Sequence, residues 1–344
     1  MTADKTAKQT AKALVFAVLV CMAIFSCATT SGVDDALPPR TAINNSAQND
    51  AGTPKSARGF FDRGMLFAEQ GDFDPAIEDF SEAINLDPNF ALAYYNRGVA
   101  YGMKGDTDRE VADYSQAVKL DPDYVAAYNN RGVVYSDKGD YDLAIADYNQ
   151  ALILAPDDAF TYNNRGVAYF DKGDIDLAIA DYNQAIRLDP DFLDAYASRG
   201  VAYFDKGDID LAIADYSQVI RLKPDYVAVY NNRGNAYSDK GDYDLAIADY
   251  NQAIKLDPNF STAYGNRGLA YFYKGDHDRA IADYDQAIKL DPNNARAYNS
   301  RGIAYYNKGD YSRAATDYEA ALLLDPNEAG YKGNLDLARQ QLGG

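Results

Sequence analysis

Aromatic and small residues recur at helical spacing through most of the chain, and one stretch shows the pattern clearly. In residues 125–158, Tyr128, Gly132 and Tyr135 lie four and three positions apart, which places them on one face of an α-helix. The sequence Lys-Gly-Asp at 138–140 then interrupts the pattern, and a glycine commonly follows the last turn of a helix. The pattern therefore predicts an amphipathic helix that stops at this glycine.

A second helix is predicted after the glycine. Ala144, Tyr148 and Ala151 again lie four and three residues apart, and the run stops at the pair Ala155-Pro156. Large aromatic residues on one helix pack over small residues on the other only where the two backbones lie close together. We therefore expect Gly132 to lie opposite Ala144 in a tightly packed helical hairpin.

Acidic residues mark the start of this second helix. Asp140 is placed to cap its N-terminus with a side-chain oxygen. Asp142 follows in the first turn, where a negative charge faces the positive end of the helix dipole. Both residues are expected to stabilise the helix start.

The pattern repeats every 34 residues. The segment RGVAYFDKGDIDLAIADY at 165–182 returns unchanged at 199–216. An Arg-Gly pair recurs at this period, with its arginine at Arg63, Arg97, Arg131, Arg165, Arg199, Arg233, Arg267 and Arg301. A proline recurs at Pro88, Pro122, Pro156, Pro190, Pro224, Pro258, Pro292 and Pro326. Eight units in one quasi-linear array thus account for most of the 344 residues.

The order aromatic, Gly, aromatic, Ala, aromatic, Ala and Pro within such a unit resembles the tetratricopeptide repeat. Two departures are a Tyr where the family often has Trp and an Arg where it often has Leu before the Gly. Glu110 and Val219 also stand at slots that otherwise hold Ala. The resemblance implies an all-α fold, a right-handed superhelical solenoid of eight helix-turn-helix units at 57–90, 91–124, 125–158, 159–192, 193–226, 227–260, 261–294 and 295–328.

The ends of the array differ from its middle, as expected for units with a single neighbour. The first unit has phenylalanine at slots that later hold mostly Tyr, namely Phe60, Phe67, Phe73 and Phe80. Beyond Pro326 a last apolar stripe consists of Tyr331, Leu335, Ala338 and Leu342. This stripe predicts a C-terminal capping helix and tail at 329–344.

The first residues resemble a secretory signal. Three lysines precede the apolar run 13–25, which is short for a bilayer span. The run ends in Ile-Phe-Ser-Cys, which resembles the lipobox of bacterial lipoproteins, although Phe25 is larger than the usual residue. We expect a signal peptide at 1–26 and lipidation of Cys27. An ordinary signal-peptidase cut near Thr30 or Ser31, or an uncleaved anchor, remains the alternative.

The segment 27–56 is rich in small and polar residues, which is typical of a flexible tether. Ala28 follows the cysteine, which by resemblance favours the outer membrane or periplasm of a bacterial cell envelope. Cys21 and Cys27 are the two cysteines of the chain, so the repeats contain neither a disulfide nor a Cys-based metal site.

Composition narrows the function classes. The chain has 52 acidic and 33 basic residues, a net charge of -19, which disfavours nucleic acid and anionic lipid as targets. His277 is the single histidine, so the sequence lacks the residues for a multi-histidine metal site and offers almost none for His-dependent nucleophilic catalysis. The repeated Asp-x-Asp lacks the alternating ligands and closing Glu of an EF-hand loop. We expect no catalytic residue, no metal and no cofactor.

Each repeated arginine is followed sixteen residues later by an aspartate, as in Arg165 and Asp181. This separation spans the hairpin turn symmetrically, so the two side chains are expected to meet on antiparallel helices. We interpret the eight arginines as an internal ladder of ion pairs that belongs to the scaffold. The alternative is that they bind a ligand.

The resemblance implies that the inward face of each first helix lines a concave groove, which is the candidate binding surface. Two residues before the glycine lie Asn96, Asn130, Asn164, Asn232 and Asn266, interrupted by Asp62, Ser198 and Ser300. This row resembles an asparagine ladder by which some superhelical family members hold the backbone of an extended polypeptide. A carboxamide can donate to and accept from any peptide unit. The alternative is that these asparagines are merely solvated.

Acidic residues follow the glycine by five positions, at Asp137, Asp171, Asp205 and Asp239. The Lys, Arg and Asn residues of the carboxylate clamp found in chaperone-binding family members are missing, since their slots hold mainly Val, Ala and Asp. A surface lined by amides and carboxylates is expected to prefer neutral or basic segments.

Together these features predict a non-catalytic protein–protein interaction scaffold at the bacterial cell envelope, which binds an extended or helical protein segment. We expect a monomer, attached to the membrane only through its lipid anchor or signal sequence. The alternatives are a self-associating structural protein and the regulatory subunit of an envelope enzyme complex.

Overall fold

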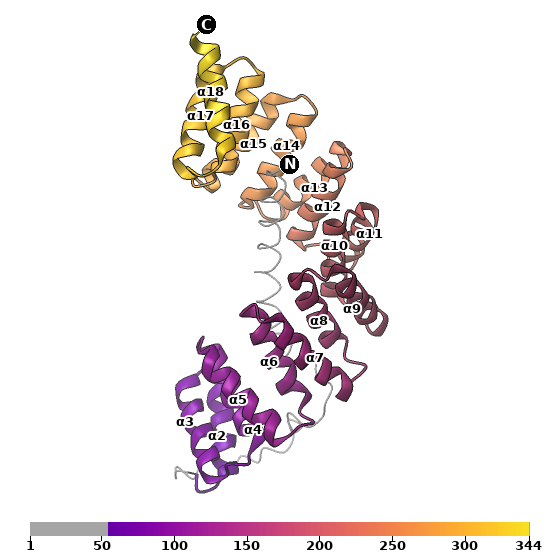
Figure 1. Ribbon diagram of the computed structural model, residues 1–344, viewed down its shortest axis with the longest axis vertical. Coiled ribbons are helices and arrows are strands. Elements are labelled where there is room, and N and C mark those ends of the chain that lie inside the picture. Colours follow the sequence, from indigo (N-terminus) through magenta and orange to yellow (C-terminus); the bar gives the residue numbers. More distant parts are fainter. Residues whose placement is uncertain (1–53, 344) are drawn as a thin grey trace. The chain divides into compact units, whose positions relative to one another are not determined.

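The computed structural model describes residues 54–343, which are all-helical (Figure 1). Within this range there are seventeen α-helices and no strand. The helices form two compact units, the first ending at Pro190 and the second beginning at Asp191. Among these residues no helix combines the length and the apolar character that crossing a membrane requires.

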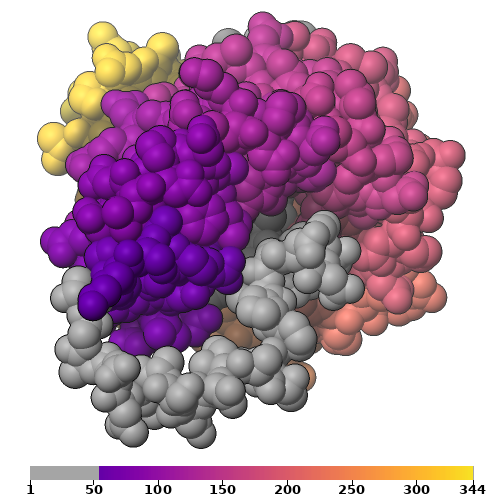
Figure 2. Space-filling view, turned by 90° about the horizontal axis from the view of Figure 1, so that it is seen from below, coloured from indigo at the N-terminus to yellow at the C-terminus, as the bar shows by residue number. Residues whose placement is uncertain are grey.

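The first unit contains four helical hairpins. Their helices are α2 (Ala57–Gln70) with α3 (Phe73–Leu86), α4 (Ala91–Met103) with α5 (Thr107–Leu120), α6 (Val125–Asp137) with α7 (Tyr141–Leu154), and α8 (Ala159–Lys172) with α9 (Ile175–Leu188). The packed hairpins give this unit a continuous surface from α2, in indigo, towards magenta (Figure 2).

The second unit contains four further hairpins and a final helix. They are α10 (Leu193–Lys206) with α11 (Ile209–Leu222), α12 (Val227–Asp239) with α13 (Tyr243–Leu256), α14 (Ser261–Tyr273) with α15 (His277–Leu290), α16 (Ala295–Asn307) with α17 (Tyr311–Leu324), and α18 (Ala329–Gly343). The expected eight helical units and capping helix are thus present.

Glycine forms the turn of each hairpin, as the sequence predicts. Gly173 follows α8 with a φ of 99°, in the left-handed region that a residue with a side chain rarely adopts. Its N–H donates to the carbonyl oxygen of Phe170, and the N–H of Asp174 donates to that of Tyr169. These bonds satisfy carbonyl groups that the end of the helix would otherwise leave unpaired.

The core of a hairpin is a tyrosine ring lying on a glycine. A Cβ atom added to Gly132 would lie 2.7 Å from Cε1 of Tyr148. Tyr148 is 1% exposed and Ala144 is fully buried beside it. The expected close approach at Gly132 is therefore present, and the atoms nearest to this glycine belong to the ring of Tyr148.

The predicted side-chain cap at Asp140 is wrong. Asp140 occupies the N-cap position of α7, but its carboxylate accepts no capping hydrogen bond. Side-chain caps do form at Asp106, Asp276 and Asp310, each of which accepts from the backbone N–H of an arginine three residues later. That arginine also donates from Nε to the same carboxylate. The residue three positions after Asp140 is Leu143, which has no such donor. The guanidinium group thus holds the capping carboxylate in place.

The final helix closes the second unit. Leu335 stands at the slot of the repeated arginine and is 4% exposed, and Ala338 is fully buried against α17. Arg339 donates a hydrogen bond to Glu319 of α17. In the earlier hairpins, the residue equivalent to Glu319 is the one that the repeated arginine of the next hairpin contacts. The predicted capping helix is confirmed, and Arg339 takes over part of the role of the missing arginine.

Candidate partner-binding face

The repeated arginines form the predicted internal ladder. In all eight repeats Nε and Nη2 of the arginine donate to the two carboxylate oxygens of the aspartate sixteen residues later, at 2.6–2.8 Å. The aspartates are 4–7% exposed. The interpretation as scaffold residues is confirmed, and the pairs are more buried than surface ion pairs.

Six of the eight arginines also bind the preceding repeat of the same unit, which the sequence interpretation missed. Arg165 Nη1 donates to Asn149 Oδ1 at 2.6 Å, and its guanidinium lies 5.4 Å from the ring centre of Tyr162. The same contact recurs from Arg97 to Ser81, Arg131 to Ser115, Arg233 to Ser217, Arg267 to Asn251 and Arg301 to Asp285. One guanidinium therefore ties the second helices of two successive hairpins together.

A second, exposed ladder links neighbouring hairpins. Within the units, the lysine of a Lys-Gly-Asp turn pairs with the aspartate thirty residues earlier, as in Lys172 and Asp142 at 2.7 Å. The other pairs within the units are Lys104 with Asp74, Lys138 with Asp108, Lys240 with Asp210, Lys274 with Asp244 and Lys308 with Asp278. Asp142, predicted to serve the helix dipole, thus also forms an inter-repeat ion pair.

The predicted asparagines are half-buried on the even-numbered helices. Asn96 lies in α4, Asn130 in α6, Asn164 in α8, Asn232 in α12 and Asn266 in α14. Within each unit these helices form one layer in which neighbours contact each other directly, as α6 contacts α8 and α12 contacts α14. The asparagines of a unit therefore belong to one layer of the array.

Some of these carboxamides also connect neighbouring helices. Asn130 donates to the hydroxyl of Tyr95 at 3.0 Å, and Asn266 donates to Asn231 and Asn235 at 3.0 Å. Asn96 instead donates to a carbonyl oxygen of its own helix. At Asn130 and Asn266 the side chain therefore helps to hold neighbouring helices together, which the sequence analysis did not predict.

Two of the asparagines have no such internal role. Asn164 and Asn232 make no side-chain hydrogen bond to any other residue in 54–343. Both remain partly accessible. Their donor and acceptor groups are consequently the most available ones in the predicted row.

The predicted acidic residues lie at or near the ends of the same helices. Asp137 and Asp239 are exposed at the last positions of α6 and α12, whereas Asp171 and Asp205 are half-buried in the last turns of α8 and α10. Each unit thus contributes two of these carboxylates to the face that contains its asparagines. They make that face acidic.

Glu110 adds a carboxyl group to the first unit. It occupies a slot that holds alanine in the other seven repeats, and it fits because Gly102 on α4 has no side chain in its way. Tyr114 donates to Glu110 Oε1 at 3.2 Å. Burial raises the pKa of Glu110 to about 7, the hydrogen bond from Tyr114 opposes this rise, and the charge of Asp137 adds to it.

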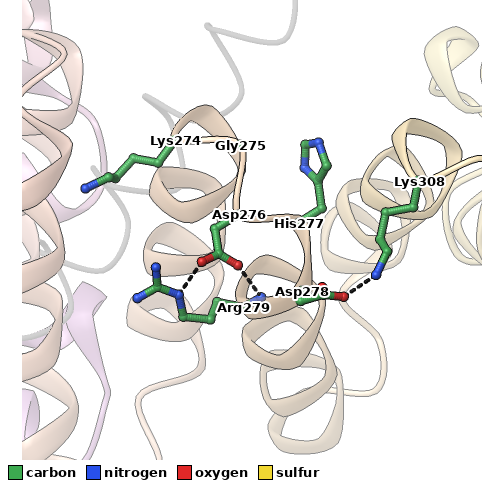
Figure 3. Close-up of a pocket in the computed structure, with 7 residues that line it drawn as sticks. All are labelled: Lys274, Gly275, Asp276, His277, Asp278, Arg279 and Lys308. Atoms are coloured by element: carbon green, nitrogen blue, oxygen red, sulfur yellow. Dashed lines mark hydrogen bonds and ion pairs between the residues drawn. The ribbon is translucent and has the colours of Figure 1, made fainter.

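A hollow of about 400 Å³ lies at the turn between α14 and α15 (Figure 3). Its cations are already paired, Lys308 with Asp278 and Arg279 with Asp276, and Lys274 points away from the Asp276–Arg279 pair. His277 is half-buried, with its ring 5.1 Å from that of Phe272. The hollow therefore presents no unbalanced charge to a ligand.

The described residues contain no group of three or more His, Cys, Asp or Glu side chains arranged to hold a metal ion. Cys27, the predicted lipidation site, lies outside the residues that the structure describes, as do the predicted signal peptide and most of the tether. These predictions stay untested by the structure.

Comparison with protein families gives matches along most of the array. Family models described as "TPR repeat" match residues 64–105, 166–207, 200–241 and 268–309. Models described as "Tetratricopeptide repeat" match residues 91–124, 125–158, 227–260, 249–282 and 295–328. No curated protein sequence matches the chain.

Two of three similar solved structures share the fold over most of the chain. A tetratricopeptide repeat protein from Parabacteroides merdae has 23% identity and a TM-score of 0.58, with 72% of this chain and 98% of that chain covered. The C-terminal part of a TPR repeat-containing protein from Cytophaga hutchinsonii has 23% identity and a TM-score of 0.57, with 70% and 99% covered. A structure of MamA has 31% identity and a TM-score of 0.45, with 48% and 97% covered.

The periodic helical hairpins, the glycine turns and the buried Tyr-on-Gly contacts agree with these matches, which together extend over well more than half of the chain. The chain therefore belongs to the tetratricopeptide repeat family.

Proposed function

We propose that this protein is a non-catalytic scaffold that binds extended protein segments along the face formed by the even-numbered helices of each unit. The observation that carries the proposal is the pair Asn164 and Asn232, whose carboxamides make no side-chain hydrogen bond within 54–343. A carboxamide can pair with the N–H and C=O of any peptide unit, so a row of them recognises backbone regardless of sequence. Repeat arrays generally use such extended surfaces for binding.

Charge favours a neutral or basic segment. Asp137 and Asp171 accompany the asparagines in the first unit, and Asp205 and Asp239 accompany them in the second. The whole chain has a net charge of -19, so an acidic segment would be repelled at low ionic strength. The affinity for a basic segment is expected to fall as the salt concentration rises.

The test uses synthetic peptide libraries of matched length with positive, zero or negative net charge, with binding measured by fluorescence anisotropy. Replacing Asn130, Asn164, Asn232 and Asn266 by Ala is expected to weaken binding by about two orders of magnitude, because each amide contributes roughly 0.5–1.5 kcal/mol. The double variant Asn164→Ala/Asn232→Ala should weaken binding without lowering stability, since neither amide has an internal partner.

The matched control replaces four exposed asparagines of the inter-hairpin turns, namely Asn89, Asn259, Asn293 and Asn327, by Ala. This control should bind as the parent does. Equal affinity of the parent and the quadruple asparagine variant for the best peptides would show that the asparagine row is solvated surface and that binding uses another face.

We also propose that the protein is exported and anchored at a bacterial cell envelope through acylated Cys27. The lipobox-like sequence before Cys27 supports this. Cys27→Ser is expected to move the protein from the membrane fraction to the soluble fraction and to abolish labelling by a fatty-acid analogue. The control Cys21→Ser changes the other cysteine of the same segment and should leave both results unchanged. Membrane association and labelling that survive Cys27→Ser would rule out the anchor.

A further inference from the structure

The junction between the second and third repeats differs from the other junctions by one carboxyl group. At this slot Ala144, Ala178, Ala212, Ala246, Ala280 and Ala314 are fully buried between helices. Glu110 replaces that alanine on α5, where it faces Gly102 of α4 and approaches Asp137 of α6. A titratable group thus lies where three helices meet.

The carboxyl group has little room and a single hydrogen-bond donor. Any Cβ at Gly102 would overlap the carboxyl group of Glu110, so the glycine is what admits it. Tyr114, which is 2% exposed, donates its hydroxyl to Glu110 Oε1 at 3.2 Å. One bond from a neutral hydroxyl offsets only part of the cost of desolvating a carboxylate.

Among residues 54–343, no cation acts on Glu110 to balance a negative charge. On α6 the facing group is Asp137, and the adjacent Lys138 is paired with Asp108 at 3.0 Å. On α5 itself Arg109 is paired with Asp106. The α4 contribution is Gly102, which has no side chain. An ionised Glu110 is therefore an unbalanced charge beside a second carboxylate.

We propose that Glu110 makes the junction of α4, α5 and α6 sensitive to pH. The neutral carboxyl packs in the alanine slot and keeps the second and third repeats together. The ionised carboxylate repels Asp137 and draws water into the junction, which loosens it.

The direction of the pH dependence follows from the pKa of Glu110. Burial raises the pKa of Glu110 from 4.5 to about 7, so the folded junction favours the protonated form. The stability that this form provides is fully present in acid and is lost as the pH rises from about 4.5 through about 7. The junction should accordingly be tighter in mild acid than in mild alkali.

Ionisation of Glu110 is also expected to affect the predicted binding face. The hydroxyl of Tyr114 also hydrogen bonds with Asn130, which in turn donates to Tyr95. Peptide binding at Asn130 should therefore vary with pH as well. This last consequence rests on the proposed function, whereas the junction itself is tested without a peptide.

The test is hydrogen exchange of the full chain, with rates corrected for the intrinsic effect of pH. Between about pH 5.5 and about pH 8.5, protection of amides in α5 and the start of α6 is expected to fall by about tenfold or more, the effect of one pKa unit. The equivalent amides of α7 and α8, at the Ala144 junction, serve as the internal control and should not change. Carbon-13 NMR of the Glu110 carboxyl should show a titration midpoint near 7.

Glu110→Gln and Glu110→Ala should both remove the pH dependence, and circular dichroism checks that each is folded. The alanine variant restores the residue of the other seven repeats, so it is expected to fold even where the glutamine variant is strained. A pH dependence of equal size in the alanine variant, or at both junctions of the parent, would overturn the proposal. So would a Glu110 midpoint near the ordinary value of 4.5.

Discussion

Gly166→Leu is expected to lower the free energy of unfolding by about 3 kcal/mol or more, at the upper end of the range for overpacked cores. Gly166 on α8 lies under the ring of Tyr182 on α9, and an added Cβ alone would be 2.6 Å from Cε1 of that ring. Tyr182 is 1% exposed and has no space to withdraw. Denaturant unfolding followed by circular dichroism measures the loss.

The matched control is Gly265→Ala on α14. Gly265 is also helical, but nothing lies within 4 Å of its added Cβ. This variant should be neutral or more stable by about 0.5–1 kcal/mol, because alanine favours the helix. Gly166→Ala should already be destabilised by about 1–3 kcal/mol. A loss equal for Gly166→Ala and Gly265→Ala would show that helix propensity, and not the ring contact, sets the effect.

The damage should also be local at first. Each repeat contacts only its neighbours, so hydrogen exchange should increase in α8 and α9 before it increases elsewhere. A uniform loss of protection across the whole array at low denaturant would contradict this expectation.

Arg165→Met is expected to cost about 3–5 kcal/mol, because it leaves the carboxylate of Asp181 buried without its partner. The side chain of Asp181 is 9% exposed, and Arg165 donates to both of its oxygens at 2.7 Å. The loss of the Asn149 contact weakens the link to the preceding hairpin as well. Urea unfolding of the parent and the variant gives the difference.

Two further variants test whether this loss of stability comes from the unpaired buried charge. Arg165→Met/Asp181→Leu removes both charges and should regain much of the stability, because no uncompensated charge remains. Lys172→Met breaks the exposed pair with Asp142 and should cost about 1 kcal/mol or less. Equal losses for Arg165→Met and Lys172→Met would mean that burial of the arginine ladder has no energetic consequence.

The contacts inside one hairpin were predictable from the sequence. Arg131 and Asp147 meet because sixteen residues span the turn symmetrically, and Gly139 ends its helix because it takes a φ of 80°. These relations follow from helical periodicity and the chemistry of the turn. The final helix was likewise visible in its apolar stripe, which buries Leu335.

The contacts between hairpins were not predictable in the same way. The bonds from Arg165 to Asn149, from Lys172 to Asp142 and from Asn130 to Tyr95 depend on how successive hairpins are rotated, which the pattern of one unit does not contain. One of these contacts did leave a signal in the sequence. A polar residue recurs sixteen positions before each arginine after the first, and it could have revealed the bond from the arginine to the preceding hairpin. The capping prediction at Asp140 failed because propensity alone does not orient a carboxylate.

The candidate binding site was predictable only as a row of residue types. The sequence placed Asn164 and Asn266 in equivalent slots, yet the second is bonded to Asn231 and Asn235 whereas the first makes no such bond. At one partner slot of the preceding helix Asn235 is replaced by Val133, and at the other Asn129 is bonded to Asp158 and Thr161 instead. Equivalent positions in a repeat therefore need not be equivalent in chemistry.

The ladders also determine how this gene can change in length. Loss of residues 227–260 would bring Ser217 to sixteen positions before Arg267 and Asp210 to thirty positions before Lys274, the separations at which Arg233 and Lys240 now bind those same partners. A recombination that removes or duplicates one whole repeat thus recreates the bonds of both ladders at the new joint. A shift by any other number of residues breaks both ladders, so growth and shrinkage of the array proceed in whole repeats.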